Sequence, residues 1–189
     1  MWTENEIIEY LKNNLKESRF KHSLSVRDTA VKLAEKYNAD IEKASLAGLV
    51  HDCAKNVEPN EIINICTEAG YNLNEVETLN PGIAHGIAGS IIAKNKMGIM
   101  DADVLSAVRF HTTGKKDMTL LEKIIYIADY VEPLRDFPGV DELRETVNKN
   151  LDEAMLLSFD QTIKYVIKRG MLIHLDTVEA RNYMIYHKE

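Results

Sequence analysis

The sequence is short of cysteine, of long apolar runs and of positive charge, and each shortage excludes a class of protein. Its two cysteines, Cys53 and Cys66, are too few for a disulfide framework. No apolar run approaches the ~20 residues of a membrane-spanning helix, and the polar, acidic start does not resemble a signal peptide. The formal charge of -7 disfavours a nucleic acid polymer or an anionic membrane as partner. We therefore expect a cytoplasmic protein.

Patterning typical of β-strands is also absent, because no segment alternates apolar and polar residues over a sustained run. Apolar residues recur at helical spacing instead, and capping boxes at Thr3/Glu6 and Thr119/Glu122 mark two helix starts. Helices are expected over about residues 3–15, 19–37, 40–55, 59–70, 83–97, 101–111, 119–131 and 151–168, and from about residue 176 onward. These features predict an all-α, compact helical bundle that forms a single domain over residues 1–189.

The pair His51-Asp52 follows an apolar helical run, where an imidazole and a carboxylate are costly unless something satisfies them. A divalent metal would satisfy both, because nitrogen and carboxylate oxygen are good ligands. His22 lies on an earlier expected helix, and Asp129 lies within a strongly apolar one. Taken singly, His22 and Asp129 are explained as well by hydrogen bonding within the core as by metal binding.

Taken together, these residues follow the order His, His-Asp, Asp on three expected helices, which is the order of the HD-domain metal phosphohydrolases. Further segments appear in the same order, at residues 19–23, 48–55, 85–86, 111–114, 127–135 and 138–140. This set resembles the bacterial HD-domain symmetrical bis(5'-nucleosyl)-tetraphosphatases over about residues 19–144. The resemblance implies an HD-type fold whose metal-site core spans about 19–144, with C-terminal helices of about 145–189 packed on it.

The resemblance also implies an acid-anhydride hydrolase that cleaves diadenosine tetraphosphate, and related dinucleoside polyphosphates, symmetrically to two ADP. Its metal ligands would be His22, His51, Asp52 and Asp129, and the family is associated with iron. A mixed nitrogen and oxygen set is equally compatible with manganese, cobalt or zinc. One ion is expected, with a second ion as the alternative.

Two residues are expected to take part in the chemistry. A metal-activated water would attack a phosphorus, and Asp52 would also accept a proton from that water. Lys55, three residues later, would bind phosphate beside the ligands. The alternative for Lys55 is a solvated side chain favoured by a helix C-terminus.

Further substrate contacts are expected from His85, His111, Arg135 and His174. His85 and His111 lie near glycines at helix boundaries and would bind phosphate or hold a second metal, the alternative being surface histidines. Arg135 suits bidentate phosphate binding, or else a loop ion pair with a neighbouring carboxylate. His174, between two helices, would contact a nucleoside or phosphate, or serve in packing.

The expected partners are a dinucleoside polyphosphate or a nucleoside diphosphate, and a second copy of the chain by the base rate of homodimers. Three other functions stay open at this point. The same fold hydrolyses mononucleotides or guanosine polyphosphates in other members of the superfamily. A degenerate HD fold would be a non-catalytic nucleotide-binding sensor, and a helical protein with core histidines would bind no metal at all.

Overall fold

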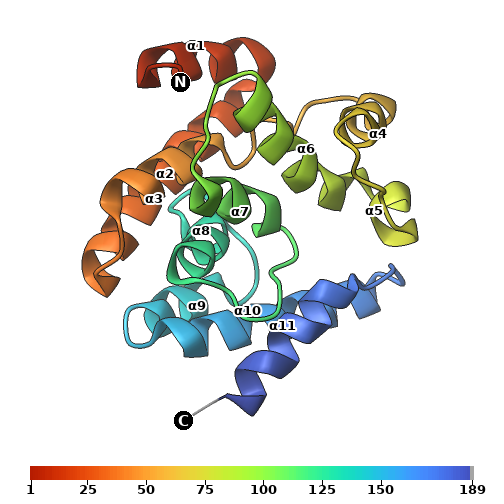
Figure 1. Cartoon of the computed structure of the whole chain (residues 1–189). Coiled ribbons are helices and arrows are strands. Elements are labelled where there is room, and N and C mark those ends of the chain that lie inside the picture. The colour runs from red at the N-terminus through yellow and green to blue at the C-terminus, as the bar shows by residue number, and fades with distance from the viewer. Residues whose placement is uncertain (188–189) are drawn as a thin grey trace.

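The computed structural model describes residues 1–187, and within this range every regular element is a helix. The all-α prediction is therefore confirmed. The helices are α1 (Glu4–Asn14), α2 (Glu17–Tyr37), α3 (Ile41–Val50), α4 (Pro59–Glu68), α5 (Glu75–Leu79), α6 (Pro81–Asn95), α7 (Ala102–Phe110), α8 (Leu120–Val131), α9 (Val140–Val147), α10 (Leu151–Lys168) and α11 (Leu175–Tyr186) (Figure 1). No helix in the described range is long and apolar enough to cross a membrane.

Helix ends follow the expected capping chemistry. The side chains of Thr3 and Thr119 accept hydrogen bonds at the starts of α1 and α8, in the two capping boxes that the sequence predicts. The carboxylate of Asp40 accepts from the backbone N–H of Lys43 at the start of α3. Asn38 ends α2 in the left-handed conformation, at a φ of 56°.

Two short helices, α5 and α9, were not expected, and α3 ends earlier than predicted. After Val50 the backbone changes to bonds that span three residues, from the Cys53 N–H to the Val50 carbonyl and from the Lys55 N–H to the Asp52 carbonyl. His51 and Asp52 therefore lie in tight turns that follow α3, rather than inside a helix.

Helix α8 runs through the main core and contacts α2, α3, α7, α9 and α10. Its most buried residues are Ile124, Ile125, Tyr126, Ile127 and Ala128. A smaller apolar cluster joins α4 to α6 and is made by Ala54, Ile62, Cys66, Ala84, Ile87 and Ala88. Because α2 and α3 both pack on α8, Asp129 near the end of α8 lies close to these two helices.

Two glycines allow the helices that carry histidines to approach one another. A Cβ at Gly48 would lie 2.9 Å from the Cα of Arg27, so α3 can pack closely on α2 only with glycine there. A Cβ at Gly86 would lie 2.7 Å from the carbonyl oxygen of Arg109, which places the same restriction on α6 and α7. Both distances are shorter than real Cβ atoms show, so a larger residue at either position would push the two packed helices apart.

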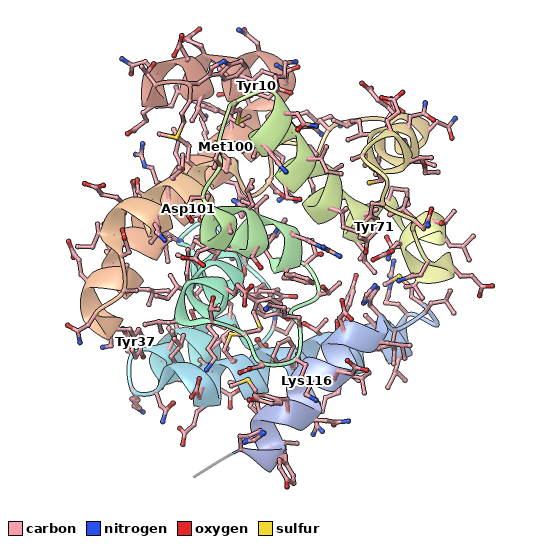
Figure 2. All side chains as sticks on the ribbon, viewed as in Figure 1. Tyr10, Tyr37, Tyr71, Met100, Asp101 and Lys116 are labelled. Atoms are coloured by element: carbon pink, nitrogen blue, oxygen red, sulfur yellow. The ribbon has the colours of Figure 1, made fainter. Side chains whose placement is uncertain are left out.

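Two tyrosines connect more distant elements, and both are visible in Figure 2. Tyr37 at the end of α2 donates its hydroxyl to the carbonyl of Val147 in α9. Tyr71, which packs against the smaller cluster between α4 and α6, donates to the Glu77 carboxylate in α5. These contacts connect α2 to α9 and the segment after α4 to α5.

Candidate active site

Four buried histidines, His22, His51, His85 and His111, present the same ring nitrogen to a common centre. In three of them Nδ1 contacts a backbone carbonyl, which only accepts, so Nδ1 carries the proton. These carbonyls belong to Gly48, Gly82 and Val108, at 2.7, 2.9 and 2.7 Å from His51, His85 and His111. In His22, Nδ1 lies 2.9 Å from Glu132 Oε1. The Nε2 lone pairs are therefore free to bind a metal.

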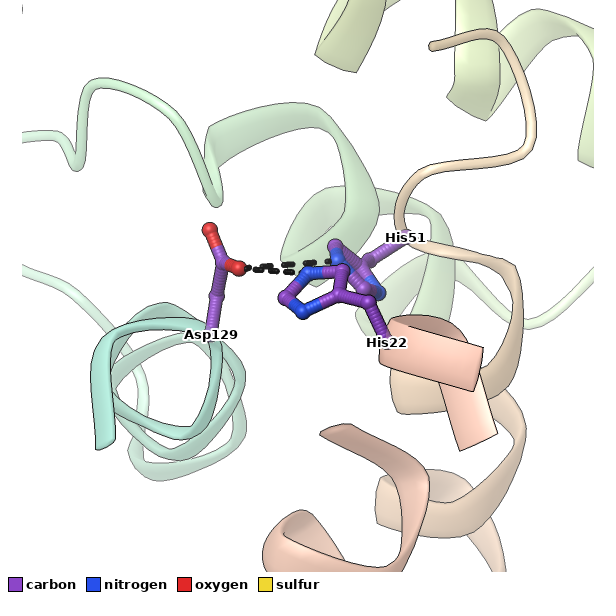
Figure 3. Close-up of side chains that lie close together, drawn as sticks. All are labelled: His22, His51 and Asp129. Carbon is purple, nitrogen blue, oxygen red and sulfur yellow. Dashed lines mark ion pairs between the residues drawn. The ribbon is translucent and has the colours of Figure 1, made fainter. Parts of the chain in front are cut away.

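The first group of ligand atoms joins α2, α8 and the turn after α3. His22 Nε2 lies 2.9 Å from Asp129 Oδ1, and His51 Nε2 lies 3.8 Å from the same oxygen (Figure 3). Asp52 Oδ2 lies 3.7 Å from each of the two Nε2 atoms. The structure thus brings together the four residues that the sequence predicts as metal ligands.

The second group surrounds the other oxygen of the same carboxylate. Asp52 Oδ1 lies 2.8 Å from His85 Nε2 and 3.6 Å from His111 Nε2, and the two ring nitrogens are 3.1 Å apart. The ammonium of Lys55 lies 3.2 Å from His85 Nε2 and 3.8 Å from Asp52 Oδ1. His85 and His111 are therefore not surface histidines: each is 1% exposed.

The first group fits a divalent metal. His22 Nε2 and His51 Nε2 are buried and have no hydrogen-bond partner among the described residues. The lone pair of His22 Nε2 faces a carboxylate oxygen, and two acceptors at 2.9 Å repel each other unless a cation lies beside both. Ligand atoms bound to one ion at about 2.1 Å are about 3 Å apart. The separation between His22 Nε2 and Asp129 Oδ1, 2.9 Å, is of that size, and the other three are longer, at 3.7 to 3.8 Å.

The protonation states also suit a metal. Burial lowers the pKa of His51 to about 3 and that of His85 to about 4, so both rings are neutral at pH 7. Burial alone would raise the pKa values of Asp52 and Asp129, but it is outweighed at both, with the Arg135 guanidinium contributing at Asp129. Both pKa values are held well below the usual range. Neutral imidazole and ionised carboxylate are the forms that bind a metal.

Cations gather at the mouth of the site although the chain is acidic overall. A cavity of about 320 Å³ is lined by Arg19, Lys21 and Arg135, together with His22, Ser18, Glu132 and Leu134. Arg19 Nη1 lies 3.1 Å from Asp52 Oδ2. Arg135 donates to the Asp129 carboxylate and, from Nε at 2.6 Å, to the Asp129 carbonyl. Its ion-pair partner is therefore a predicted metal ligand rather than a neighbour in its loop.

Sequence reasoning assigned no role to two of these residues, Arg19 and Glu132. Glu132 is 1% exposed and accepts from His22 Nδ1, from the Ser25 hydroxyl at 2.6 Å and from the Leu134 N–H at 2.6 Å. Both residues carry a signal that could have found them: Arg19 stands three residues before His22, and Glu132 stands three after Asp129. One helical turn separates each from a ligand.

His174 occupies a different position from the other predicted contacts. Its Nδ1 accepts the N–H of Asp176 as the N-cap of α11, and its Nε2 lies 3.2 Å from Glu77 Oε1 in α5. These bonds connect α5 to α11. Its predicted role as a substrate contact stays a prediction.

Cys53, next to Asp52, is not poised to act as a nucleophile. It is 1% exposed, its thiol lies 3.4 Å from the Gly89 carbonyl, and burial raises its pKa to about 12. A reactive cysteine needs the opposite shift, toward thiolate at neutral pH. The groups of the site that can take part in a reaction are therefore the histidines, the carboxylates and the cationic side chains.

Comparison with known proteins places this arrangement in a family. The family model for the HD domain matches residues 19–134, which include the four histidines of the candidate site, Asp52 and Asp129. The chain belongs to the HD domain family. Arg135 lies one residue beyond the matched range, and α9 to α11 follow it.

Relatives of this HD domain chain align over nearly its whole length. A symmetrical bis(5'-nucleosyl)-tetraphosphatase of Halalkalibacterium halodurans is 38% identical, over 96% of this chain and 97% of that protein. One of Bacillus subtilis, of the same name, is 36% identical over 95% and 96%. A crystal structure described as a predicted HD superfamily hydrolase involved in NAD metabolism, from Clostridium acetobutylicum, is 57% identical. Its TM-score is 0.97 with full coverage of both chains.

Proposed function

We propose that this chain hydrolyses diadenosine tetraphosphate, and related dinucleoside polyphosphates, symmetrically to two nucleoside diphosphates. The relatives named above supply the substrate class. The observation that carries the proposal is the placement of Asp52. Its Oδ2 faces His22 and His51, the two histidines that also lie near Asp129. Its Oδ1 faces His85, His111 and Lys55. A metal group and a phosphate-binding group thus share one carboxylate.

We assign one metal ion to His22, His51, Asp52 and Asp129. The second group also contains two histidines, but it already holds the Lys55 ammonium, 3.2 Å from His85 Nε2. A second dication there would be repelled by this charge, whereas a phosphate would be attracted by it. Phosphate beside the two rings would also stabilise their protonated, hydrogen-bond-donating forms. Phosphate contacts are therefore favoured for His85 and His111.

A divalent ion in the first group would lower the pKa of a bound water and offset charge on the phosphoryl group. The protein residues supply the other requirements. Lys55 would donate to the scissile phosphate from one side of Asp52, while Arg19 and Arg135 would bind phosphates at the cavity mouth. Asp52 would take the proton of the attacking water, the water oxygen would bond to phosphorus, and ADP would leave as the anhydride bond breaks.

Product analysis tests this proposal directly. Protein reconstituted separately with iron, manganese, cobalt or zinc is incubated with diadenosine tetraphosphate, and the nucleotides are separated by ion-exchange chromatography. We expect ADP as the sole nucleotide product. ATP with AMP would show asymmetric cleavage. Orthophosphate from mononucleotides or guanosine polyphosphates, without ADP from the dinucleotide, would favour the other hydrolase class. Nucleotide binding without turnover with all four metals would favour a sensor.

Metal counting tests the assignment of the two groups. We expect one ion per chain, loss of that ion in His22→Ala, and retention of it in His111→Ala with a KM raised at least about tenfold. His187→Ala, at an exposed histidine near the end of α11, is the control for loss of an imidazole. Two ions per chain, falling to one in His111→Ala, would reassign the second group to a metal.

A further inference from the structure

The guanidinium of Arg144, on α9, binds three carbonyl oxygens at the end of α8. Its Nε donates to the Val131 carbonyl at 3.0 Å, and its Nη2 donates to the carbonyls of Glu132 and Arg135, each at 2.9 Å. Its Nη1 is paired at 3.0 Å with Asp141 on its own helix. All three nitrogens of the guanidinium are thus engaged, and two of them hold the turn that follows α8.

This turn carries two side chains of the candidate site. Glu132 accepts the Nδ1–H of His22 inside the protein, and Arg135 reaches back to Asp129 and lines the cavity mouth. Within the turn, the Arg135 N–H donates to the Glu132 carbonyl at 3.0 Å, and the Leu134 N–H donates to the Glu132 carboxylate. Leu134 itself is 61% exposed and contributes little packing.

We propose that Arg144 is a positioning residue for the active site. By holding the carbonyls on both sides of the turn, it keeps Arg135 directed at the cavity mouth and Glu132 directed at His22. The part of this proposal that concerns substrate rests on the proposed function. Arg144 is not itself a lining residue of the cavity, and its side chain bonds none of the four predicted metal ligands, so its effect passes through Glu132 and Arg135, whose backbone carbonyls it holds.

Only arginine suits this position. A planar guanidinium presents several N–H groups in fixed directions and can bind three separated carbonyls at once. A lysine would keep the positive charge at the C-terminal end of α8, where it is favourable, but a single ammonium cannot reproduce the three directions. Arg144→Lys therefore separates the geometric role from the charge.

The experiment compares Arg144→Lys with Arg181→Lys in the metal-loaded protein. Arg181 on α11 is the matched control, because its side chain is also 31% exposed and also forms an ion pair, with Asp160 on α10. In Arg144→Lys we expect the amides of Leu134 and Arg135 to exchange hydrogen about tenfold faster. We also expect the KM for diadenosine tetraphosphate to rise about tenfold, with a smaller change in kcat. Arg181→Lys should change neither.

A double-mutant cycle tests the route through Arg135. In an Arg135→Ala background, Arg144→Lys should raise the KM by less than about twofold further, because Arg135, the oriented residue that would bind substrate at the cavity mouth, is already gone. Additive effects would overturn this route. Unchanged exchange in the turn, or faster exchange across all helices alike, would overturn the positioning role. Hydrogen exchange needs no substrate, so its result holds even if the chain fails to cleave the dinucleotide.

Discussion

Replacing Glu132 with glutamine should weaken metal binding without removing any metal ligand. The Glu132 carboxylate holds the Nδ1 proton of His22, and this bond determines which ring nitrogen faces the metal group. Burial alone would raise the pKa of Glu132, but hydrogen bonds from Ser25, His22 and the Leu134 backbone lower it. The carboxylate is therefore charged at neutral pH, and glutamine removes that charge.

The size of the effect follows from the three donors that Glu132 satisfies. Glutamine keeps one acceptor oxygen but turns an N–H₂ toward at least one donor. Hydrogen bonds to a buried charged group contribute about 1.5–3 kcal/mol, so we expect a loss of about 2–3 kcal/mol of unfolding free energy. For a chain of this size that lowers Tm by about 4–12 °C. Loss of a partner that orients a metal ligand weakens metal binding by about 10- to 100-fold.

The assay is a chelator competition that measures metal affinity, run beside thermal melting of the metal-free protein. Glu122→Gln is the matched control. Glu122 lies in the first turn of α8, the helix that Glu132 follows, is also 1% exposed, and also satisfies three donors, which are the Ser106 hydroxyl, the Thr119 N–H and the Lys115 ammonium. Both variants should melt earlier, but only Glu132→Gln should lose metal affinity.

Two results would refute this reasoning. If Glu132→Gln binds metal as tightly as the unchanged protein, the orientation of His22 does not depend on the carboxylate. If Glu122→Gln loses as much metal affinity as Glu132→Gln, the effect is a general consequence of lower stability. Measuring affinity well below both melting temperatures keeps these two results distinct.

Three further predictions concern other parts of the site. Lys55→Ala should keep the metal but raise the KM at least about tenfold, and metal loss in this variant would show that Lys55 supports the ligands instead. Gly86→Ala should cost about 1–3 kcal/mol of stability, because its Cβ would lie 2.7 Å from the Arg109 carbonyl oxygen; an unchanged Tm would show that α6 and α7 separate freely. Burial raises the pKa values of Cys53 and Cys66 to about 12 and 11, so neither should react with iodoacetamide at pH 8 unless urea unfolds the chain, and labelling of the native protein would contradict this.

Much of the helical fold could be predicted because local chemistry marks it. The capping boxes at Thr3 and Thr119 lie where expected, and so do the caps at Asp40 and Asn38. The short helices α5 and α9 were missed because they are too short to show a clear apolar period. The Asn74/Glu77 capping box was a usable signal for α5.

The site was harder to predict where it depends on burial. The apolar signal of α3 continues past Val50 because Cys53 and Ala54 are also buried, although the helix has ended by then. His85 lies between Ala84 and Gly86, small residues that do not show from the sequence how closely α6 approaches α7 and His111. Only the assembled structure shows that their Nε2 atoms meet at Asp52.

The four histidines of the candidate site differ in how readily mutation can alter the contact that holds their Nδ1 proton. In His51, His85 and His111, the proton on Nδ1 is held by the carbonyl of the residue three positions earlier, and no substitution can delete a carbonyl. Only His22 depends on a side chain for the same contact, that of Glu132. Among these four contacts, position 132 is the one where mutation could adjust how tightly the metal is held while every ligand stays in place. Related chains that work at different metal concentrations should therefore differ at this position before they differ at any ligand.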